Sequence, residues 1–249
     1  MSESVETKSG ESVDVLFDGA LKIIQSRSGY RFSLDALLLA RFATIKPRDR
    51  VIDLGTGNGV IALILARRHP EVEITGVELQ NALAERAARN VALNQLDGRV
   101  SLGRGDVRAA RSIAAPEHFD AVVCNPPYRR RASGRISPVE EKKIACHEIH
   151  GELGDFINAG FFLLRTKGRM AVVYWAERAV DLLASLRQAG LEPKRLRMVH
   201  SFAQDEASLV LVEAVKGGRS GVEILPPLIV YRAAQEYSEE VTAMLAGKF

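Results

Sequence analysis

The sequence predicts an α/β fold in which a mostly parallel sheet of seven strands carries helices on both faces and ends in an antiparallel hairpin. Strand-like apolar runs alternate with helical stretches through the middle of the chain. One run, Phe119–Cys124, is short and apolar, as strands buried on both faces are. Two β-prone runs, Leu191–His200 and Ser208–Val215, follow each other near the end and predict the hairpin.

Length and composition favour one domain. The chain has 249 residues, of which 47% are hydrophobic, so it can bury a large core. Its start is rich in Ser, Glu and Lys, which predicts a disordered tail over residues 1–12. The domain then spans residues 13–249, with a hairpin and helix at 13–46, a catalytic core at 47–216 and an extended segment at 217–249.

Charge and cysteine content limit the partners and the cellular compartment that the chain can have. Lys and Arg number 34 against 31 Asp and Glu, so an anionic partner has to be met by a local patch. Two cysteines cannot form a disulfide framework, and no apolar run approaches the roughly twenty residues that cross a bilayer. We expect a soluble cytoplasmic protein that is a monomer or homodimer and has no membrane partner.

Two elements precede the core. Apolar residues on both sides of Asp18 and Gly19 predict a hairpin over residues 13–26. Ser33 is a candidate N-cap for a helix in which apolar residues recur at helical spacing. Tyr30, Arg31, Phe32 and Asp35 cluster at the start of that helix. They either cover the sheet edge or take part in ligand binding.

The stretch Val51–Gly59, V-I-D-L-G-T-G-N-G, predicts a strand, a tight turn and a helix start. Its alternate glycines let the backbone approach a ligand closely. It lacks the Lys of a phosphate-binding loop and the spacing of a nicotinamide fingerprint. Asp53 precedes the first glycine, and Glu78 ends the next apolar run. Two acids beside such a loop suit a cationic amino acid joined to a nucleoside, which is S-adenosylmethionine.

The remaining core elements alternate regularly. Strands are expected at 72–79, 100–107 and 169–175, and helices at 82–96, 153–164 and 177–189, with Lys167–Gly168 closing the second helix. Four polar residues fall at the carboxyl ends of the first four core strands, where ligands bind in doubly wound sheets: Asp53, Glu78, Asp106 and Asn125.

The fourth strand runs directly into Asn125-Pro126-Pro127-Tyr128. Two prolines stiffen the turn and leave its carbonyl oxygens as fixed acceptors. The amide oxygen of Asn125 and the carbonyl oxygen of Pro126 can accept both N–H bonds of an exocyclic amine, and Tyr128 can stack on a base. Such a turn holds the amine in line with a methyl group and needs no metal.

These motifs resemble known families. The glycine stretch is similar to the first motif of class I methyltransferases, which have a Rossmann-like fold, and Asn-Pro-Pro-Tyr is similar to the pattern of amino-group methyltransferases. The segments Y-R-F-S-L-D-A-L-L-L-A, H-E-I-H-G-E-L and L-P-P-L-I-V-Y resemble bacterial tRNA(Val) adenine-N6 methyltransferases. Within the wider group of amino-group methyltransferases the acceptor can be adenine N6, guanine N2 or a glutamine side chain.

The resemblance implies the site residues. Adenine would meet Asn125, Pro126, Pro127 and Tyr128. S-adenosylmethionine would meet a set of residues near the strand ends: Phe32, Ser33, Asp35, Asp53, Gly55, Gly57, Asn58, Gly59, Glu78, Leu79, Asp106, Val107 and Asn125. The substrate tRNA would lie near Lys216 and Arg219.

Basic residues also follow the catalytic turn, at Arg129, Arg130 and Arg131. Charged runs usually lie in solvated loops, but these residues adjoin the site and can contact phosphates. His147 and His150 near Cys146 lack a convincing third ligand, so we expect no metal.

Four other functions compete. A glutamine-N5 methyltransferase acting on a release factor would carry a helical domain ahead of the glycine loop, for which only about fifty residues are available. An rRNA amino methyltransferase is a closer alternative, while DNA enzymes usually carry a separate recognition domain. An RNA-binding module without chemistry would not need both motifs intact.

Overall fold

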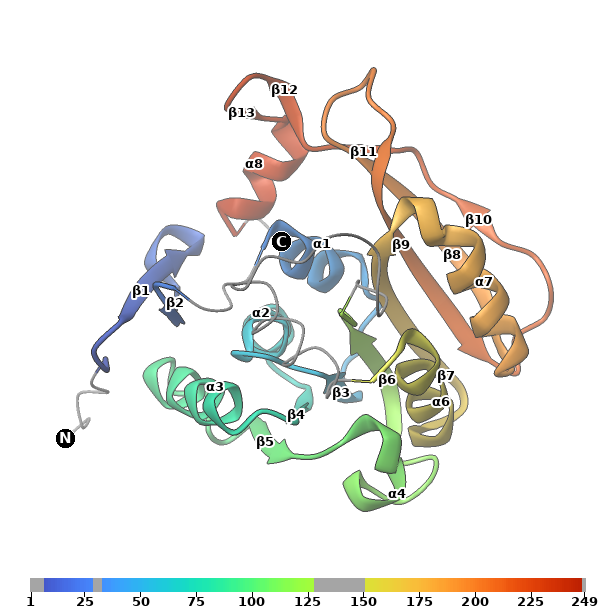
Figure 1. Ribbon diagram of the computed structural model, residues 1–249, viewed down its shortest axis with the longest axis horizontal. Coiled ribbons are helices and arrows are strands. Elements are labelled where there is room, and N and C mark those ends of the chain that lie inside the picture. Colours follow the sequence, from blue (N-terminus) through green and yellow to red (C-terminus); the bar gives the residue numbers. More distant parts are fainter. Residues whose placement is uncertain (1–6, 29–32, 128–150, 248–249) are drawn as a thin grey trace, which may run out of the picture.

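The computed structural model describes residues 7–28, 33–127 and 151–247. At its centre lies a sheet in the order β10-β8-β9-β7-β6-β3-β4-β5, with β11 also paired to β8 (Figure 1). Neighbours among β3 to β7 run parallel, and β9 runs antiparallel to β7 and β8. The long strands are β3 (Arg50–Leu54), β4 (Glu73–Glu78), β5 (Val100–Arg104), β6 (Phe119–Cys124), β7 (Leu164–Trp175), β8 (Leu191–His200) and β9 (Ala207–Lys216).

The predicted seven strands and the C-terminal antiparallel hairpin are confirmed. The sheet has nine strands within the described ranges, because β10 (Glu223–Ile224) and β11 (Leu228–Ile229) add to the free edge of β8. Each of these two strands has two residues, too few for a periodic pattern to predict.

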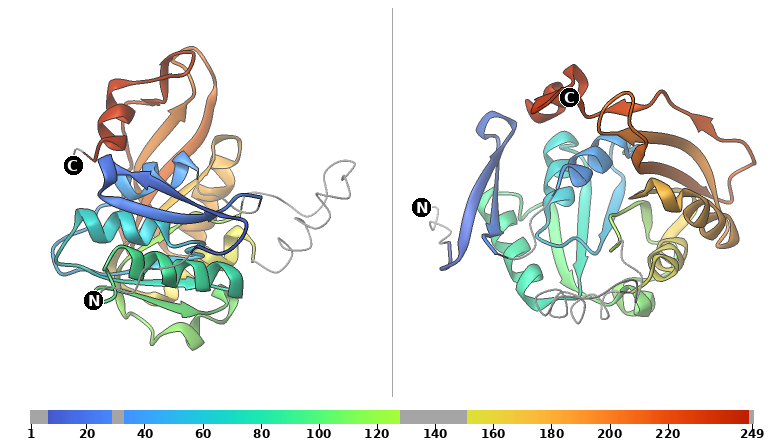
Figure 2. Two further views of the ribbon diagram at one scale, coloured as in Figure 1. Left: turned by 90° about the vertical axis from the view of Figure 1, so that its left-hand side faces the viewer. Right: turned by 45° about the horizontal axis from the view of Figure 1, so that its top comes forward.

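Helices cover both faces of the sheet. One face carries α1 (Leu34–Phe42), α2 (Val60–Arg68) and α3 (Asn81–Leu93), and the other carries α4 (Ala110–Ile113), α6 (Leu153–Leu163) and α7 (Ala179–Gln188) (Figures 1 and 2). Strand residues alternate between two cores: Val51 and Val123 face α1 and α2, while Ile52 and Val122 face α6 and α7. Strands buried on both faces therefore read as apolar runs in the sequence.

The N-terminal hairpin is confirmed and begins earlier than expected. It pairs β1 (Glu11–Leu16) with β2 (Leu21–Ser26) and lies beside α3 (Figure 2). Glu11 is therefore part of a strand and not of a disordered tail. Its buried carboxylate accepts hydrogen bonds from Arg86 and Arg89, and these contacts, Arg89 first, lower the pKa of Glu11 to about 2.

Three other boundaries differ from the sequence expectations. Strand β5 ends at Arg104, because Val107 begins a short 3₁₀ turn. Strand β7 starts at Leu164 directly after α6, so Lys167 and Gly168 lie inside a strand and do not close the helix. The segment 217–249 is not simply extended. It contains the short pair β12 (Tyr231–Ala233) and β13 (Glu236–Tyr237), and then α8 (Glu239–Leu245), which buries Val241 and Met244.

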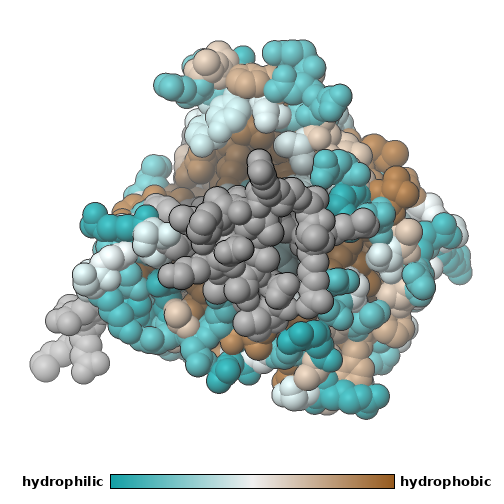
Figure 3. Space-filling model, in the orientation of Figure 1, coloured by the Kyte–Doolittle hydropathy of each residue, from teal (hydrophilic) through white to brown (hydrophobic). Residues whose placement is uncertain are grey.

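The described surface is mixed in polarity. Figure 3 shows hydrophilic residues over much of this face, and hydrophobic residues beneath the segment of β12, β13 and α8 at the top. Within the described ranges, none of the helices has the length and apolarity that crossing a membrane requires.

Candidate active site

A cavity of about 280 Å³ opens at the carboxyl edge of the parallel strands, which is where the doubly wound topology places a ligand site. Its volume lies near the lower end for small-molecule sites. Residues from seven separate segments of the chain line it: Ser33, Asp35, Gly55, Gly57, Val77, Glu78, Leu79, Gln80, Leu83, Gly105, Asp106, Val107, Asn125, Pro126, Pro127, Phe156 and Trp175.

The glycine loop bends over the end of β3. Gly55, Gly57 and Gly59 all have positive φ, at 72°, 60° and 85°, so the turn requires them. Gly55 has a second reason to lack a side chain, because a Cβ there would stand 3.0 Å from the ring of Phe156 on α6. The loop thus brings bare backbone to the cavity wall.

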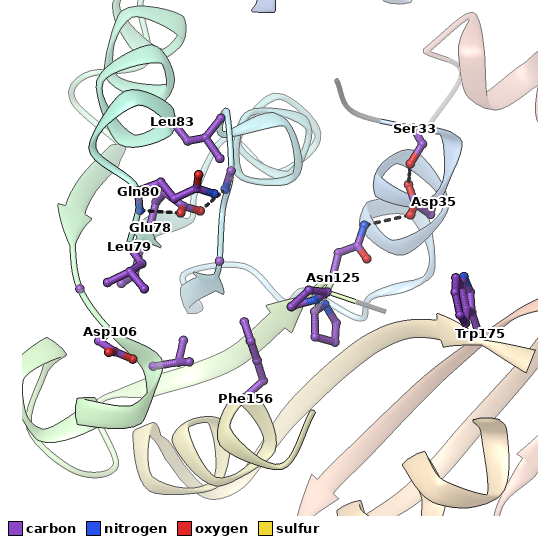
Figure 4. Close-up of a pocket in the computed structure, with 17 residues that line it drawn as sticks. Ser33, Asp35, Glu78, Leu79, Gln80, Leu83, Asp106, Asn125, Phe156 and Trp175 are labelled. Atoms are coloured by element: carbon purple, nitrogen blue, oxygen red, sulfur yellow. Dashed lines mark hydrogen bonds between the residues drawn. The ribbon is translucent and has the colours of Figure 1, made fainter. Parts of the chain in front are cut away.

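Glu78 fixes the loop to the next strand. Its buried carboxylate accepts hydrogen bonds from the backbone N–H of Gly57 at 3.0 Å and of Gln80 at 2.8 Å (Figure 4). Burial raises the pKa of Glu78, and the N–H groups of Gln80 and Gly57 partly offset that effect. The sequence correctly placed an acid at this end of the cavity.

Asp53 does not line the cavity, although we expected it to contact the cofactor. The side chain is fully buried beneath the glycine loop, where Oδ2 accepts a hydrogen bond from the Thr56 hydroxyl at 2.6 Å. Burial raises the pKa of Asp53 to about 7, even though the Thr56 hydroxyl and the N–H of Ala62 favour the ionised form. Asp53 therefore supports the loop from below.

Asn58 and Gly59 also lie outside the cavity wall. Gly59 occupies the N-cap position of α2, and the backbone oxygen of Asn58 accepts a hydrogen bond from the side chain of Asn90 at 2.9 Å. The Asn58 side chain is fully buried and its amide atoms make no hydrogen bond with the described residues. Both residues shape the loop from behind.

Asp106 and Val107 line the cavity, and Asp106 lies below Glu78 in Figure 4. The Asp106 carboxylate accepts hydrogen bonds from the backbone and the guanidinium of Arg108, which hold the pKa of Asp106 below its ordinary value. Two acids with opposite pKa shifts therefore flank one end of the cavity.

Asn125 follows β6 and is tied to the start of α1. Its Nδ2 donates a hydrogen bond to Oδ2 of Asp35 at 3.1 Å, and Asp35 also accepts a hydrogen bond from the Ser33 hydroxyl (Figure 4). The Ala36 N–H donates a further hydrogen bond to Asp35. A carboxylate only accepts hydrogen bonds, so this contact turns the amide nitrogen toward α1 and the amide oxygen away from it. Pro126 and Pro127 continue the wall of the cavity.

Six lining residues escaped the sequence analysis: Val77, Gln80, Leu83, Gly105, Phe156 and Trp175. Gln80 and Leu83 follow Glu78 within five residues, so their position past a strand end was an available signal. Phe156 lies on α6 and Trp175 ends β7, and no local pattern connects either residue with the glycine loop.

Several expected contacts fall outside the described residues. These are Phe32, Tyr128, Arg129, Arg130 and Arg131, together with Cys146, His147 and His150. Their roles at the cofactor, the base or the RNA, and the expectation that no metal is bound, stay predictions.

Lys216 and Arg219 lie at the edge of the sheet opposite the cavity. Strand β9 is antiparallel to β7, so its last residue stands beside the first residues of its neighbours, with Lys216 opposite Leu191. Lys216 Nζ donates hydrogen bonds to the carbonyl oxygens of Phe161 and Leu164 at 2.8 and 2.7 Å and pairs with Glu117. Its ammonium group is thus engaged at the end of α6, which argues against the expected RNA contact.

Comparisons with known proteins agree with the fold. The family model described as methyltransferase small domain matches residues 34–181. A tRNA1(Val) (adenine(37)-N6)-methyltransferase of Porphyromonas gingivalis is 29% identical over 88% of each chain, and one of Vibrio campbellii is 25% identical over 98% of this chain and 96% of that protein.

Among solved structures, a protein of Agrobacterium tumefaciens described as a predicted O-methyltransferase superposes with a TM-score of 0.71 at 23% identity, covering 86% of this chain and 96% of its own. At that identity the likeness concerns the fold alone. The family model covers more than half of the chain, and the chain belongs to the methyltransferase small domain family.

Proposed function

We propose that the chain transfers the methyl group of S-adenosylmethionine to the exocyclic N6 of adenine in tRNA, at adenine 37 beside the anticodon of tRNA(Val). The observation that carries the proposal is the Asn125-Pro126-Pro127 turn in the wall of the same cavity as Glu78 and the glycine loop. The names of the Porphyromonas and Vibrio relatives support the target base and the tRNA. The cytoplasm, where tRNA is modified in bacteria, is the proposed place of action.

The cavity fits S-adenosylmethionine, the methyl donor of this reaction. When bound, it supplies an electrophilic methyl group on a sulfonium. Bare backbone at Gly55 and Gly57 allows close approach, and Glu78 offers carboxylate oxygens to ribose hydroxyls. Leu79, Leu83 and Phe156 give the cavity apolar walls on which an adenine ring can pack.

Asn125 and Pro126 prepare the acceptor. The N6 lone pair of adenine is delocalised into the ring, so the amine is a weak nucleophile while it stays planar. The Oδ1 of Asn125 and the carbonyl oxygen of Pro126 accept its two N–H bonds and favour a more tetrahedral nitrogen. As the N6–C bond forms, the nitrogen becomes cationic and then loses a proton, so no strong base is needed beforehand.

Asp35 supports this step without contacting the substrate. It holds Nδ2 of Asn125 at 3.1 Å, which fixes the amide oxygen as the acceptor. Fixed acceptors aimed at a developing positive charge lower the barrier because they need no reorganisation during the reaction.

RNA contacts are proposed for Arg129, Arg130 and Arg131, which follow the catalytic turn in the sequence. They would bind phosphates and set the position of the anticodon loop. A loop presents its bases unstacked, so the target adenine can enter the cavity at low cost.

The function is tested by offering the purified protein S-adenosylmethionine with a labelled methyl group and separate pools of unmodified tRNA, rRNA, DNA and release factor. We expect label in tRNA and little in the other pools. Label found mainly in the release factor would establish the glutamine-N5 reaction, and label found mainly in rRNA would move the substrate to that class.

A further inference from the structure

Trp175 is the last residue of β7 and lines the cavity. It is half-buried, and it is the single tryptophan of the chain. An apolar core residue would be expected at this place in a strand whose preceding residues, Val172 to Tyr174, are completely buried. Instead, this large ring forms part of the wall of the cavity.

The sheet register places Trp175 beside the catalytic turn. Cys124 of β6 pairs with Val172 of β7, so Asn125 stands at the level of Val173, and Trp175 stands two residues further out on the neighbouring strand. Adjacent strands lie about 5 Å apart, and two residues advance a strand by about 7 Å. Trp175 is therefore separated from Asn125 by a distance comparable with the size of a purine.

Trp175 and Asn125 also face the same side of the sheet. Side chains of a strand alternate between faces, and Val173 belongs to the core on the α1 side, so Trp175 points to that side as well. Asn125 reaches the same side, since its amide bonds to Asp35 on α1. Helix α1 itself packs on β7.

The cavity has two ends. In Figure 4 Glu78, Gln80, Leu83 and Asp106 lie at one end, Trp175 stands at the other, and Asn125 lies between them. The transferred methyl group has to reach the acceptor amine beside Asn125, because that residue holds the amine. With the methyl donor at the end of Glu78, the acceptor has to enter from the end of Trp175.

We propose that Trp175 binds the target adenine by stacking on its ring and so holds N6 against Asn125. This inference rests on the proposed function and adds a base-binding residue to it. Stacking between a base and an aromatic ring tolerates any base, so Trp175 supplies affinity and position, while the turn at Asn125 selects an exocyclic amine.

Because the chain has one tryptophan, its intrinsic fluorescence reports directly on this contact. The protein saturated with S-adenosylhomocysteine is titrated with an anticodon stem–loop RNA that has adenine at position 37, and with a matched RNA that has an abasic residue there. We expect a loss of Trp175 emission with the first RNA and a much smaller loss with the second. Equal losses for both RNAs would overturn the inference.

Variants give a second measurement. Trp175→Ala should lower kcat/KM for tRNA roughly 5- to 150-fold, the range expected for one stacked base. Trp175→Phe should recover most of that loss, and the affinity for S-adenosylhomocysteine should stay unchanged in both. Phe161→Ala removes an exposed aromatic ring that contacts Lys216 at the opposite edge, and it should leave kcat/KM unchanged.

The outcomes separate this inference from the function on which it rests. Wild-type protein that does not methylate adenine N6 in tRNA would refute the proposed function. Wild-type protein that does so, with Trp175→Ala fully active, refutes the base contact alone. A Trp175→Ala variant that loses affinity for S-adenosylhomocysteine or melts at a lower temperature would assign Trp175 a structural role and also overturn the inference.

Discussion

Asp35 fixes the orientation of the Asn125 amide, the group that we propose to contact the substrate. The resemblance to known methyltransferases places Asp35 next to the cofactor, whereas the structure shows its carboxylate bonded to Nδ2 of Asn125, to Ser33 and to the N–H of Ala36. A role in orienting Asn125 affects turnover, and a role in cofactor binding affects cofactor affinity. Kinetics can therefore distinguish the two roles.

Replacing Asp35 tests this orientation. Asp35→Ala removes a hydrogen bond to a charged group, which is worth about 1.5–3 kcal/mol, so kcat should fall about 10- to 100-fold. Asp35→Asn can still accept a hydrogen bond from Asn125 and should lose less. The measurements are kcat with tRNA and the affinity for S-adenosylhomocysteine by calorimetry. A loss of affinity at unchanged kcat would restore the cofactor role.

Asp53→Asn tests the buried carboxyl under the loop. Burial raises the pKa of Asp53 from 3.8 to about 7, so the folded chain keeps a proton that the unfolded chain releases, and this group lowers stability as pH rises between those values. Asn has no proton to lose. The variant should be more stable at pH 8, by up to about 4 kcal/mol, and its advantage should shrink by more than half at pH 5.

Urea unfolding of the wild-type chain and of Asp53→Asn at pH 8 and pH 5 measures the difference in their free energies of unfolding. Asp106→Asn is the matched control with the opposite sign, because Arg108 holds the pKa of Asp106 below its ordinary value and the ionised form is favoured in the fold. A gain in stability of Asp53→Asn that is the same at both pH values would contradict the raised pKa of Asp53 in the folded chain.

At the scale of elements, Lys216 joins the last strand to the end of α6. The carbonyl oxygens of Phe161 and Leu164 lie at the C-terminal end of α6, where the helix offers them no N–H donor. The Lys216 ammonium donates hydrogen bonds to both oxygens, and its positive charge lies close to the negative end of the helix dipole. The resemblance to tRNA methyltransferases implied an RNA contact for Lys216. Only the pairing of β9 with β7 and β8 shows that Lys216 lies at the end of the sheet opposite the Asn125-Pro126-Pro127 turn.

Lys216→Met separates these two interpretations, since it keeps much of the side-chain stem and removes the charge. It should destabilise the fold by about 1–3 kcal/mol, because two carbonyl groups lose their donor, and it should leave the salt dependence of tRNA binding unchanged. Replacing Arg129, Arg130 and Arg131 together by Ala should flatten that salt dependence. A flatter salt dependence in Lys216→Met would return Lys216 to the RNA interface.

The elements also show where sequence reasoning works. Strands β6 and β8 were predicted to the residue, because β6 is a compact apolar run and Gly190 marks the start of β8. Strands β10 and β11 exist through their pairing with β8, and Glu223 to Ile229 carries no strand pattern of its own. The sequence gives the position of Asp53 in a strand but not the direction of its side chain, which does not line the cavity, and its expected cofactor contact stays a prediction.

At the scale of the whole molecule, the topology gathers the site. Parallel strands β3, β4, β5 and β6 bring their carboxyl ends to one edge, so Glu78, Asp106 and Asn125 could be placed together from the sequence. Trp175 and Phe156 reach the same cavity from β7 and α6, and only the packed fold shows it. The expectation of a monomer or homodimer stays a prediction.

The identity of the methylated nucleoside tests the account most directly. Unmodified tRNA is incubated with the protein and S-adenosylmethionine, digested to nucleosides and analysed by mass spectrometry against standards. We expect N6-methyladenosine with the wild-type chain and at least a hundredfold less with Asn125→Ala, since the turn holds N6 and no ring nitrogen. Methyl groups found instead on adenine N1 or guanine N2, or N6-methyladenosine formed equally by Asn125→Ala, would contradict the account.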